Sequence, residues 1–474
     1  MTTTAQSAPA VAYIGEKGPI GLFLTLQLAF FILYTMVNYT LFNEGFAHPY
    51  LLFFGEKALL VLKGVPPRLE NIGFIYPPLP VFIAGLFNGN ALLAQSLVSS
   101  LISAFIGMEV LKGVRSPGLA ASLIGFLTLS FPVLFLATQR FDLYLYFFLL
   151  IVSMKYLYQY VKNEYSLHLF LSGPFFGMTF FTHFSSLYLI PMFFIMIFLL
   201  YRTNLRKFTA VSLVFFTPYL IFMGIFSYIN WVFTSEAFGY LRNYILMFSN
   251  PDTEAVVSSG DVLGSLAYSL KYVFQALPVL APCLLGVFYD RRLVAAVPFI
   301  IIFSFVYSNL FFPAIHASAI FIIFFLVMTE FGDKLKPGLL IAALCISLLS
   351  SPLLALVSAE RHEKGFARAF WGDFDRNMAG YQKAAALLRE TEGKILLDDA
   401  GAYPLIYCLK SPERFILPYQ YEYTPALTNP AFFATYVVAL KDRNRDSLYQ
   451  LFEGGIKGFH PVFDDGTMII WGKT

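Results

Sequence analysis

The chain has 474 residues, of which 58% are hydrophobic, 18% are aromatic and only 13% are charged, and its mean hydropathy is +0.68. Soluble globular proteins carry about 25% charged and about 45–50% apolar residues, so the composition excludes a soluble enzyme of this length and a disordered or collagen-like chain. The formal net charge of +3 is small and dispersed, which argues against nucleic acid as a partner.

Charged residues are unevenly distributed along the chain. Residues 1–358 contain 18 Lys/Arg and 14 Asp/Glu, about one residue in eleven, whereas residues 359–474 contain 14 and 15, one in four. One charged residue in four, as in residues 359–474, is ordinary for a soluble domain. The sequence therefore predicts an all-α polytopic membrane domain over residues 1–358 and a small α/β domain over residues 359–474.

Apolar runs near the length needed to cross a bilayer, about 20 residues, predict eleven membrane-spanning helices. Their approximate ranges are 20–42, 91–111, 117–138, 142–161, 165–182, 185–201, 208–232, 264–288, 293–311, 315–332 and 337–357. A shorter run at 77–87 begins with three prolines among four residues, and we expect an interfacial or re-entrant helix there. The polar N-terminal segment lacks the features of a signal peptide, so the first run is expected to remain as an anchor.

The basic residues set the expected orientation in the membrane. With the N-terminus inside, the inner side carries twelve basic residues and the outer loops carry five. Because basic residues favour the cytoplasmic side, we expect a cytoplasmic N-terminus and an extracytoplasmic C-terminal domain. Two outer loops, 43–90 and 233–263, are long. The first contains an amphipathic stretch at 50–63, and the second is expected to contain a short interfacial helix at 238–245.

The tail has the pattern of a small α/β domain. Its expected elements are a helix at 375–389, a strand at 394–397, a helix at 402–409, a strand at 436–440 and a hairpin at 460–471 that turns at Asp465-Gly466. Asp398 and Asp399 follow a strand without a glycine-rich phosphate loop, so turn and N-cap chemistry is favoured over a nucleotide site.

Ionisable residues of the membrane domain gather at the expected outer ends of its helices. Glu44 follows the first span, and His316 lies near the start of the tenth. Arg140 and Asp142 lie between the third and fourth spans, and His183 lies between the fifth and sixth. Intramembrane ionisable groups are costly and are therefore functional hypotheses. Their collection on one side indicates an outward-facing active site rather than a conduction path.

Several motifs follow one another in the first outer loop. Asn43-Glu44-Gly45-Phe46 precedes the expected helix, and Lys63-Gly64-Val65-Pro66 and Ile75-Tyr76-Pro77-Pro78-Leu79-Pro80 come after it. This order resembles the first external loop of GT-C-type glycosyltransferases that use polyprenyl-phosphate sugars, such as the protein O-mannosyltransferases and the lipid A aminoarabinose transferases. Gln139-Arg140-Phe141-Asp142 is similar to the junction where these families carry a second Asp. Asn43 stands where the leading Asp of the family is expected.

The resemblance implies an inverting transfer of a monosaccharide from a polyprenyl-phosphate donor to a lipid, polysaccharide or protein acceptor. It implies Glu44 as the base, supported by Asp142. Phosphate leaves as an anion without a general acid, so one carboxylate that deprotonates the acceptor suffices, whereas glycosidases need two. Arg140, Arg242 and Arg68 are the cations expected at the donor phosphate.

Other loop residues are secondary candidates. The possible acceptor or sugar contacts are Asn43, His48, Glu70, Tyr76 and His183. Glu56 and Glu70 lie in a loop where charges are expected to be solvated. No cofactor is expected. No His/Asp/Glu cluster has metal-ligand spacing, but the need for a divalent metal stays open because Glu44 and Asp142 could meet in space.

Structural roles and other function classes compete with these assignments. Glu44 could be a solvated residue beyond a helix end, Arg140 and Asp142 a plain ion pair, Arg242 a headgroup anchor and His183 a helix-end packing residue. A lipid-linked glycan ligase or polymerase is an alternative that would use several outer-loop arginines. A non-enzymatic lipid or glycan transporter is another, and two related halves with broken helices would favour it.

Overall fold

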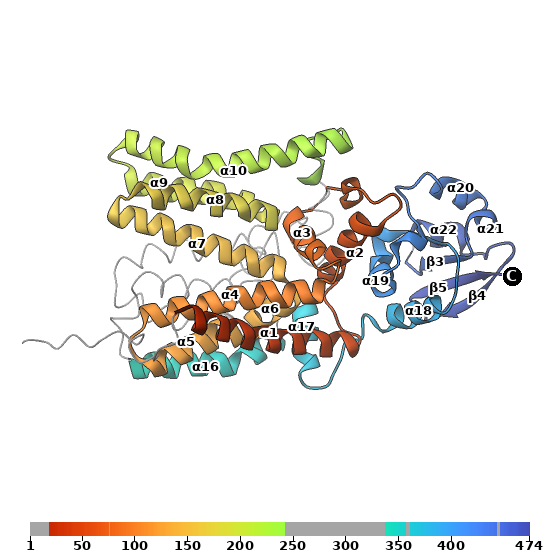
Figure 1. The fold of residues 1–474 in the computed structure, drawn as a ribbon, viewed down its shortest axis with the longest axis horizontal. Coiled ribbons are helices and arrows are strands. Elements are labelled where there is room, and N and C mark those ends of the chain that lie inside the picture. Colours follow the sequence, from red (N-terminus) through yellow and green to blue (C-terminus); the bar gives the residue numbers. More distant parts are fainter. Residues whose placement is uncertain (1–18, 75, 242–336, 357–360, 443–445) are drawn as a thin grey trace, which may run out of the picture. The chain divides into compact units, whose positions relative to one another are not determined.

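The computed structural model describes residues 19–74, 76–241, 337–356, 361–442 and 446–474. Within these ranges the chain is mostly helical, with one five-stranded sheet in its C-terminal part (Figure 1). The spans predicted at 264–288, 293–311 and 315–332 lie outside the described residues, as do Arg242 and His316.

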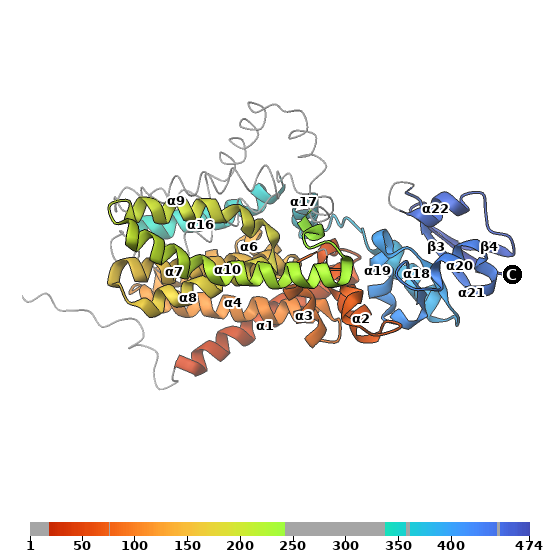
Figure 2. The same ribbon diagram turned by 90° about the horizontal axis from the view of Figure 1, so that it is seen from above.

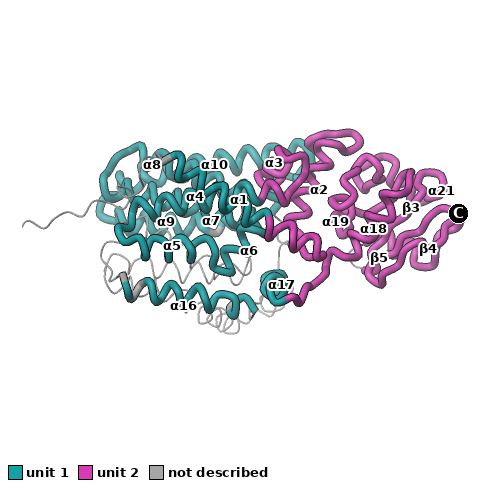
Figure 3. The backbone as a smooth tube through the Cα atoms, turned by 60° about the horizontal axis from the view of Figure 1, so that its bottom comes forward, with its two compact units in different colours: residues 1–35, 74–77, 96–371 teal, residues 36–73, 78–95, 372–474 magenta. Residues whose placement is uncertain are grey.

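The chain divides into two compact units (Figure 3). The first contains residues 1–35, 74–77 and 96–371, and the second contains residues 36–73, 78–95 and 372–474. Most of the first outer loop therefore belongs to the same unit as the tail. The domain boundary expected at residues 358/359 stays a prediction.

Long apolar helices make up most of the first unit, although the ends of two of them, residues 36–43 and 91–95, belong to the second unit. The helices are α1 (Pro19–Asn43), α4 (Ala91–Gly113), α5 (Pro117–Leu129), α6 (Phe131–Gln139), α7 (Phe141–Asn163), α8 (Ser166–Thr182), η3 (Phe184–Tyr188), α9 (Leu189–Tyr201), α10 (Leu205–Thr234), α16 (Pro337–Leu356) and α17 (Arg361–Ala369). Among the described residues, five helical segments are long and apolar enough to cross a membrane, or six if α5 and α6 form one span. The protein is thus a multi-pass membrane protein, but the count of eleven spans is not confirmed.

The span predicted at 117–138 is two helices bent by 50°, which corrects the sequence prediction. Pro132 lies in the first turn of α6 and has no N–H to donate to the carbonyl of Thr128 four residues earlier, so the helix breaks there. The Tyr34 hydroxyl donates to this carbonyl instead (3.1 Å). The break is therefore accommodated by a hydrogen bond within the first unit.

Close helix packing in the first unit depends on small residues. In both views α8 lies beside α7 and α10 (Figures 1 and 2). A Cβ added at Gly173 would lie 2.9 Å from the carbonyl oxygen of Val214 on α10, so only glycine permits this approach. Ser153 on α7 and Ser172 on α8 donate to each other's carbonyls (2.9 and 2.8 Å). The two buried serine hydroxyls are thereby satisfied.

The first outer loop forms three short helices. They are α2 (Pro49–Lys63), η2 (Leu69–Ile72) and α3 (Pro78–Leu86). The amphipathic stretch predicted at 50–63 is confirmed as α2, although most of its side chains are buried. The segment predicted at 77–87 is a helix of nine residues, which is too short to span a bilayer.

The tail alternates strands and helices around a single sheet. Its elements are α18 (Ala379–Arg389), β1 (Ile395–Leu397), α19 (Asp399–Leu409), η6 (Pro412–Arg414), β2 (Phe415–Ile416), α20 (Tyr423–Thr428), α21 (Pro430–Phe433), β3 (Tyr436–Leu440), α22 (Ser447–Phe452), β4 (Phe459–Asp464) and β5 (Met468–Lys473). The strand order is β2-β1-β3-β5-β4. The first three strands are parallel, and β5 is antiparallel to both β3 and β4.

Most elements predicted in the tail are confirmed, with two corrected helix starts. The hairpin turns at Asp465-Gly466, where Gly466 has φ 86°. The helix predicted from 375 begins at Ala379, and the helix predicted from 402 begins at Asp399. The second helix starts earlier because the Asp398 carboxylate accepts from the Ala400 N–H (3.1 Å) and caps it.

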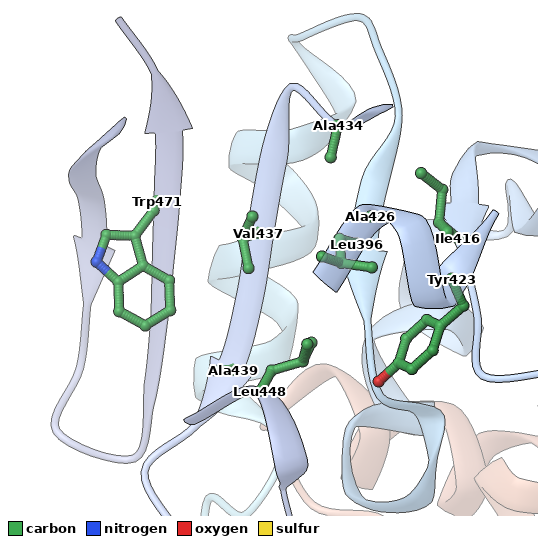
Figure 4. Close-up of a cluster of buried hydrophobic side chains, with 9 residues drawn as sticks. All are labelled: Leu396, Ile416, Tyr423, Ala426, Ala434, Val437, Ala439, Leu448 and Trp471. Atoms are coloured by element: carbon green, nitrogen blue, oxygen red, sulfur yellow. The ribbon is translucent and has the colours of Figure 1, made fainter. Parts of the chain in front are cut away.

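One buried apolar cluster holds the strands and helices of the tail together (Figure 4). It consists of Leu396, Ile416, Tyr423, Ala426, Ala434, Val437, Ala439, Leu448 and Trp471. Leu396 is fully buried in the central part of the sheet.

Shortening Leu396 to Ala is expected to lower the free energy of unfolding of this unit by about 2–5 kcal/mol, because a cavity remains where the side chain was. Thermal unfolding of the full-length protein in detergent measures the effect. Leu451→Ala is the matched control, since Leu451 is 59% exposed. Equal transition temperatures for the two variants would contradict the assigned core.

Candidate functional site

Glu44 lies at the C-terminal end of α1, and its side chain is exposed. The next residue, Gly45, adopts the left-handed backbone conformation (φ 86°). The N–H of Phe46 donates to the carbonyl of Leu41 (2.9 Å), and the N–H of Gly45 donates to that of Phe42 (3.0 Å). This is a Schellman motif, in which glycine ends the helix without strain. Within the described ranges no cation lies at ion-pair distance from Glu44, so its carboxylate is available as a base.

The backbone beside Glu44 is tied to the start of the tail within the second unit. The side-chain amide of Asn377 donates to the carbonyl of Ala47 (2.8 Å), and its oxygen accepts from the Ala47 N–H (3.2 Å). The N–H of Met378 donates to the carbonyl of Gly45 (2.8 Å). Three hydrogen bonds between segments 330 residues apart thus fix the backbone next to the candidate base.

A buried charge cluster joins α2 to the tail. The ammonium of Lys57 lies 2.7 Å from the Asp399 carboxylate at the start of α19 and 3.4 Å from the Glu56 carboxylate. Glu56 is fully buried, which corrects the expectation that it is solvated. Burial raises the pKa of Glu56 to about 8, against the opposing effect of the Lys57 charge. The side chain is therefore protonated over much of the neutral range.

The raised pKa of Glu56 predicts a pH-dependent stability. The unfolded group ionises near pH 4.5 and the folded group near pH 8, so the stabilisation from proton binding is complete below about pH 4.5 and is lost as the pH rises through 8. Glu56→Gln is expected to match the wild type at pH 5 and to exceed its free energy of unfolding by roughly 1–4 kcal/mol at pH 9. Unfolding curves at both pH values measure this. The exposed Glu70→Gln is the control, and a Glu56→Gln curve that follows the wild type at pH 9 would refute the assignment.

Three of the other candidates of the first outer loop have structural partners. His48 is buried, and its Nδ1 accepts from the Tyr50 N–H (3.2 Å), so it caps α2. Arg68 and Glu70 form an ion pair at 2.9 Å, with side chains 37% and 45% exposed. Asn43 is the exposed last residue of α1. Any contact of these residues with sugar or acceptor stays a prediction.

Arg140 and Asp142 form a bidentate ion pair at the junction of α6 and α7. The distances are 3.0 Å from Nε to Oδ1 and 2.9 Å from Nη2 to Oδ2. The two side chains are only 6% and 2% exposed. Asp142 lies in the first turn of α7, where the helix dipole favours a negative charge. The pair is thus a buried fixed dipole rather than an exposed surface ion pair.

His183 lies near this ion pair within the first unit. It follows α8 directly, is buried, and has its Nδ1 2.6 Å from the Ser185 hydroxyl. Its ring centroid is 5.7 Å from that of Tyr146, one turn beyond Asp142 on α7. Asp142 and Arg140 act on it electrostatically. The structure therefore brings together three of the predicted site residues, Arg140, Asp142 and His183.

The segment that carries Tyr76 is fastened to α10. Asn230 donates from its side-chain amide to the carbonyl of Phe74 (2.8 Å), and the Phe74 ring stacks on Phe233 at 4.9 Å. Tyr76 itself is fully buried. Asn230 is a residue that the sequence analysis missed, and an amide within an otherwise apolar span was the available signal.

The predicted site residues fall into two groups. Tyr76 belongs to the first unit together with the Arg140 cluster, whereas the candidates of the first outer loop, including Glu44, belong to the second. Arg242 lies outside the described residues. Of the helix predicted at 238–245, residues 238–241 are described, and 239–241 are helical. Among described side chains, no group of three or more His, Cys, Asp or Glu is placed to hold a metal ion. The expectation that no cofactor is required stays a prediction.

The chain shares its fold with a solved structure described as ArnT from Cupriavidus metallidurans bound to undecaprenyl phosphate. The match covers 97% of this chain and 99% of that chain, with a TM-score of 0.59 and 14% sequence identity. No family model matches the chain, and no curated protein matches it. The fold expected from the resemblance of the first outer loop to GT-C-type transferases is confirmed.

Proposed function

We propose that this protein is a membrane glycosyltransferase that transfers a monosaccharide from a polyprenyl-phosphate donor to an acceptor outside the cytoplasm. The observation that carries the proposal is the shared fold over 97% of the chain with a protein that holds undecaprenyl phosphate. The exposed carboxylate of Glu44, at the end of a membrane-spanning helix and without a cation partner among the described residues, supplies the chemical group that the reaction needs.

The proposed reaction is a direct displacement at the anomeric carbon. An acceptor hydroxyl or amine attacks this carbon, the bond to the phosphate oxygen breaks, and polyprenyl phosphate leaves as an anion. Glu44 takes the proton of the acceptor as general base. Attack opposite the leaving group inverts the anomeric configuration.

Cationic groups are proposed to stabilise the phosphate as its negative charge develops. Arg140 is the main candidate, with Arg242 and Arg68 as further ones. Two guanidinium nitrogens of Arg140 are held by Asp142, which orients the group in advance. Asp142 therefore acts through the position of Arg140, and Glu44 alone is proposed to accept the proton.

The product of the reaction distinguishes a transferase from a transporter. Purified protein in liposomes, supplied with labelled polyprenyl-phosphate sugar and membrane extract, is expected to give labelled acceptor and free polyprenyl phosphate. Movement of intact donor across the bilayer without a covalent product would contradict the proposal and favour a transporter. Transfer of an oligosaccharide from a diphosphate donor would favour a ligase or polymerase.

The proposed reaction also requires the N-terminus inside and the tail outside. A variant without its three native cysteines but with Lys383→Cys in the tail is expected to react with a membrane-impermeant maleimide in intact cells. Lys112→Cys at the end of α4 is expected to react only after permeabilisation, because basic residues favour the cytoplasmic side. The reverse labelling pattern would overturn the orientation.

A further inference from the structure

A cavity of about 240 Å³ lies within the second unit, apart from Glu44 and the charge cluster of α2. Its walls come from the last turn of α1, the start of α4, α18 and the C-terminal end of α19. Tyr39 and Phe42 are contributed by α1, which is long and apolar enough to span a membrane. The cavity therefore lies at the end of a helix that is long and apolar enough to span a membrane, where lipid headgroups are expected.

Two cations line the cavity, and none of its lining residues is acidic. Arg389 donates from Nη2 to the carbonyl of Cys408 at the end of α19, which uses one of the five guanidinium donors. Lys410 follows α19 and is exposed. In the described part of the chain, neither cation has a carboxylate at ion-pair distance.

The two cations act on the same small volume. Burial raises the pKa of the Cys408 thiol to about 12, and the positive charges of Arg389 and Lys410 both oppose this rise. Because neither cation has a carboxylate at ion-pair distance among the described residues, the two charges give the cavity a positive potential that an anion can neutralise.

The remaining lining groups combine hydrogen-bonding and apolar surface. The Asn90 amide, which caps α4, donates to the Tyr39 hydroxyl (3.0 Å), and Phe42 and Leu92 are apolar. Pockets for drug-sized ligands are about 300–1,000 Å³, so this cavity suits a smaller group such as a lipid headgroup.

We propose that this cavity binds the phosphate group of an anionic membrane lipid, with Arg389 and Lys410 as its ligands. Phosphate accepts charge-assisted hydrogen bonds from both side chains, and the acyl chains extend from the site into the bilayer beside α1. This binding site goes beyond the proposed transfer reaction, because it requires neither donor sugar nor acceptor.

Lys410 can be replaced without a change in its backbone conformation. Its φ of 61° is left-handed, a conformation that asparagine tolerates, so Lys410→Asn removes the charge while keeping the end of α19. Lys410→Arg keeps the charge. Lys383→Asn is the matched control, since Lys383 is an exposed lysine on α18 that does not line the cavity.

Native mass spectrometry of the full-length protein in detergent measures the binding of dioctanoyl phosphatidylglycerol. Lys410→Asn is expected to weaken binding by about tenfold, whereas Lys410→Arg and Lys383→Asn remain within about threefold of wild type. Dioctanoyl glycerol, which lacks the phosphate, is expected not to distinguish the variants. Equal lipid affinity of Lys410→Asn and wild type would overturn the proposal.

The source of the phosphate is identified by a soluble competitor. Glycerol phosphate without acyl chains is expected to compete only weakly, because a lipid adds apolar contacts along α1. Strong Lys410-dependent binding of glycerol phosphate would support the phosphate site but assign it to a soluble ligand. Because binding is measured without sugar transfer, its outcome is independent of the proposed enzymatic function.

Discussion

Replacing Glu44 with Gln is expected to lower kcat for sugar transfer by about 10²–10⁴-fold, the usual contribution of a positioned general base. Glutamine has the same shape as glutamate but cannot accept the proton of the acceptor. The KM for the donor is expected to change little, because the proposed phosphate contacts come from other side chains. Initial rates at saturating donor, with protein amount and folding verified, measure the effect.

Glu422→Gln is the matched control for Glu44. It makes the same chemical change at another exposed carboxylate of the second unit, one that has no proposed contact with donor or acceptor, so we expect kcat within a few-fold of wild type. Full activity of folded Glu44→Gln would move the base to another carboxylate. Asp142 would be tested next, although its bidentate contact with Arg140 makes it a weaker base.

Replacing Arg140 with Met is expected to destabilise the protein by about 3–5 kcal/mol, because the Asp142 carboxylate would remain buried without its partner. The side chains of Arg140 and Asp142 are 6% and 2% exposed, so water cannot replace the guanidinium beside the Asp142 carboxylate. Unfolding of the full-length protein in mixed micelles, followed as a function of denaturing detergent, measures the loss.

Two further variants test whether the expected loss of stability comes from leaving a buried charge unpaired rather than from removing a charge. The double variant Arg140→Met with Asp142→Leu is expected to recover much of the lost stability, because no unpaired charge remains. Lys112→Met removes a lysine that is 59% exposed from its pair with Glu109, which keeps Lys155 as a partner. This change is expected to cost less than about 1 kcal/mol. A loss for Arg140→Met no larger than that of Lys112→Met would show that the pair is not buried in the membrane-embedded protein.

Local patterns in the sequence predicted much of the local structure. The Asp465-Gly466 turn predicted the terminal hairpin, and the amphipathic stretch at 50–63 predicted α2. Apolar length predicted most described membrane helices, but it could not reveal the bend before Pro132. That bend depends on the missing proline N–H and on Tyr34, which lies in another helix.

Contacts between distant segments were beyond the reach of the sequence. Nothing local to Ala47 indicates that Asn377 binds it. Glu56 was expected to be solvated because it lies in an outer loop, yet it is fully buried beside Lys57. Tertiary packing decides such burial, and hydrophobic periodicity reports only one helix at a time.

For the predicted site residues too, local sequence predicted some contacts, whereas others depend on tertiary packing. The pairing of Arg140 with Asp142 follows from their spacing across a helix start, and the sequence analysis considered it. The proximity of His183 depends on how α7 packs against α8. Asn230 was missed because one amide does not interrupt an apolar span.

Release of free polyprenyl phosphate from a panel of polyprenyl-phosphate sugars tests the proposed transfer and its base together. Wild type and Glu44→Gln are compared by lipid mass spectrometry, with membrane extract as the source of acceptor. We expect the wild type to release one polyprenyl phosphate per sugar transferred and the variant to release at least a hundredfold less. Sugar transfer by the wild type without any release of polyprenyl phosphate would contradict the proposed reaction.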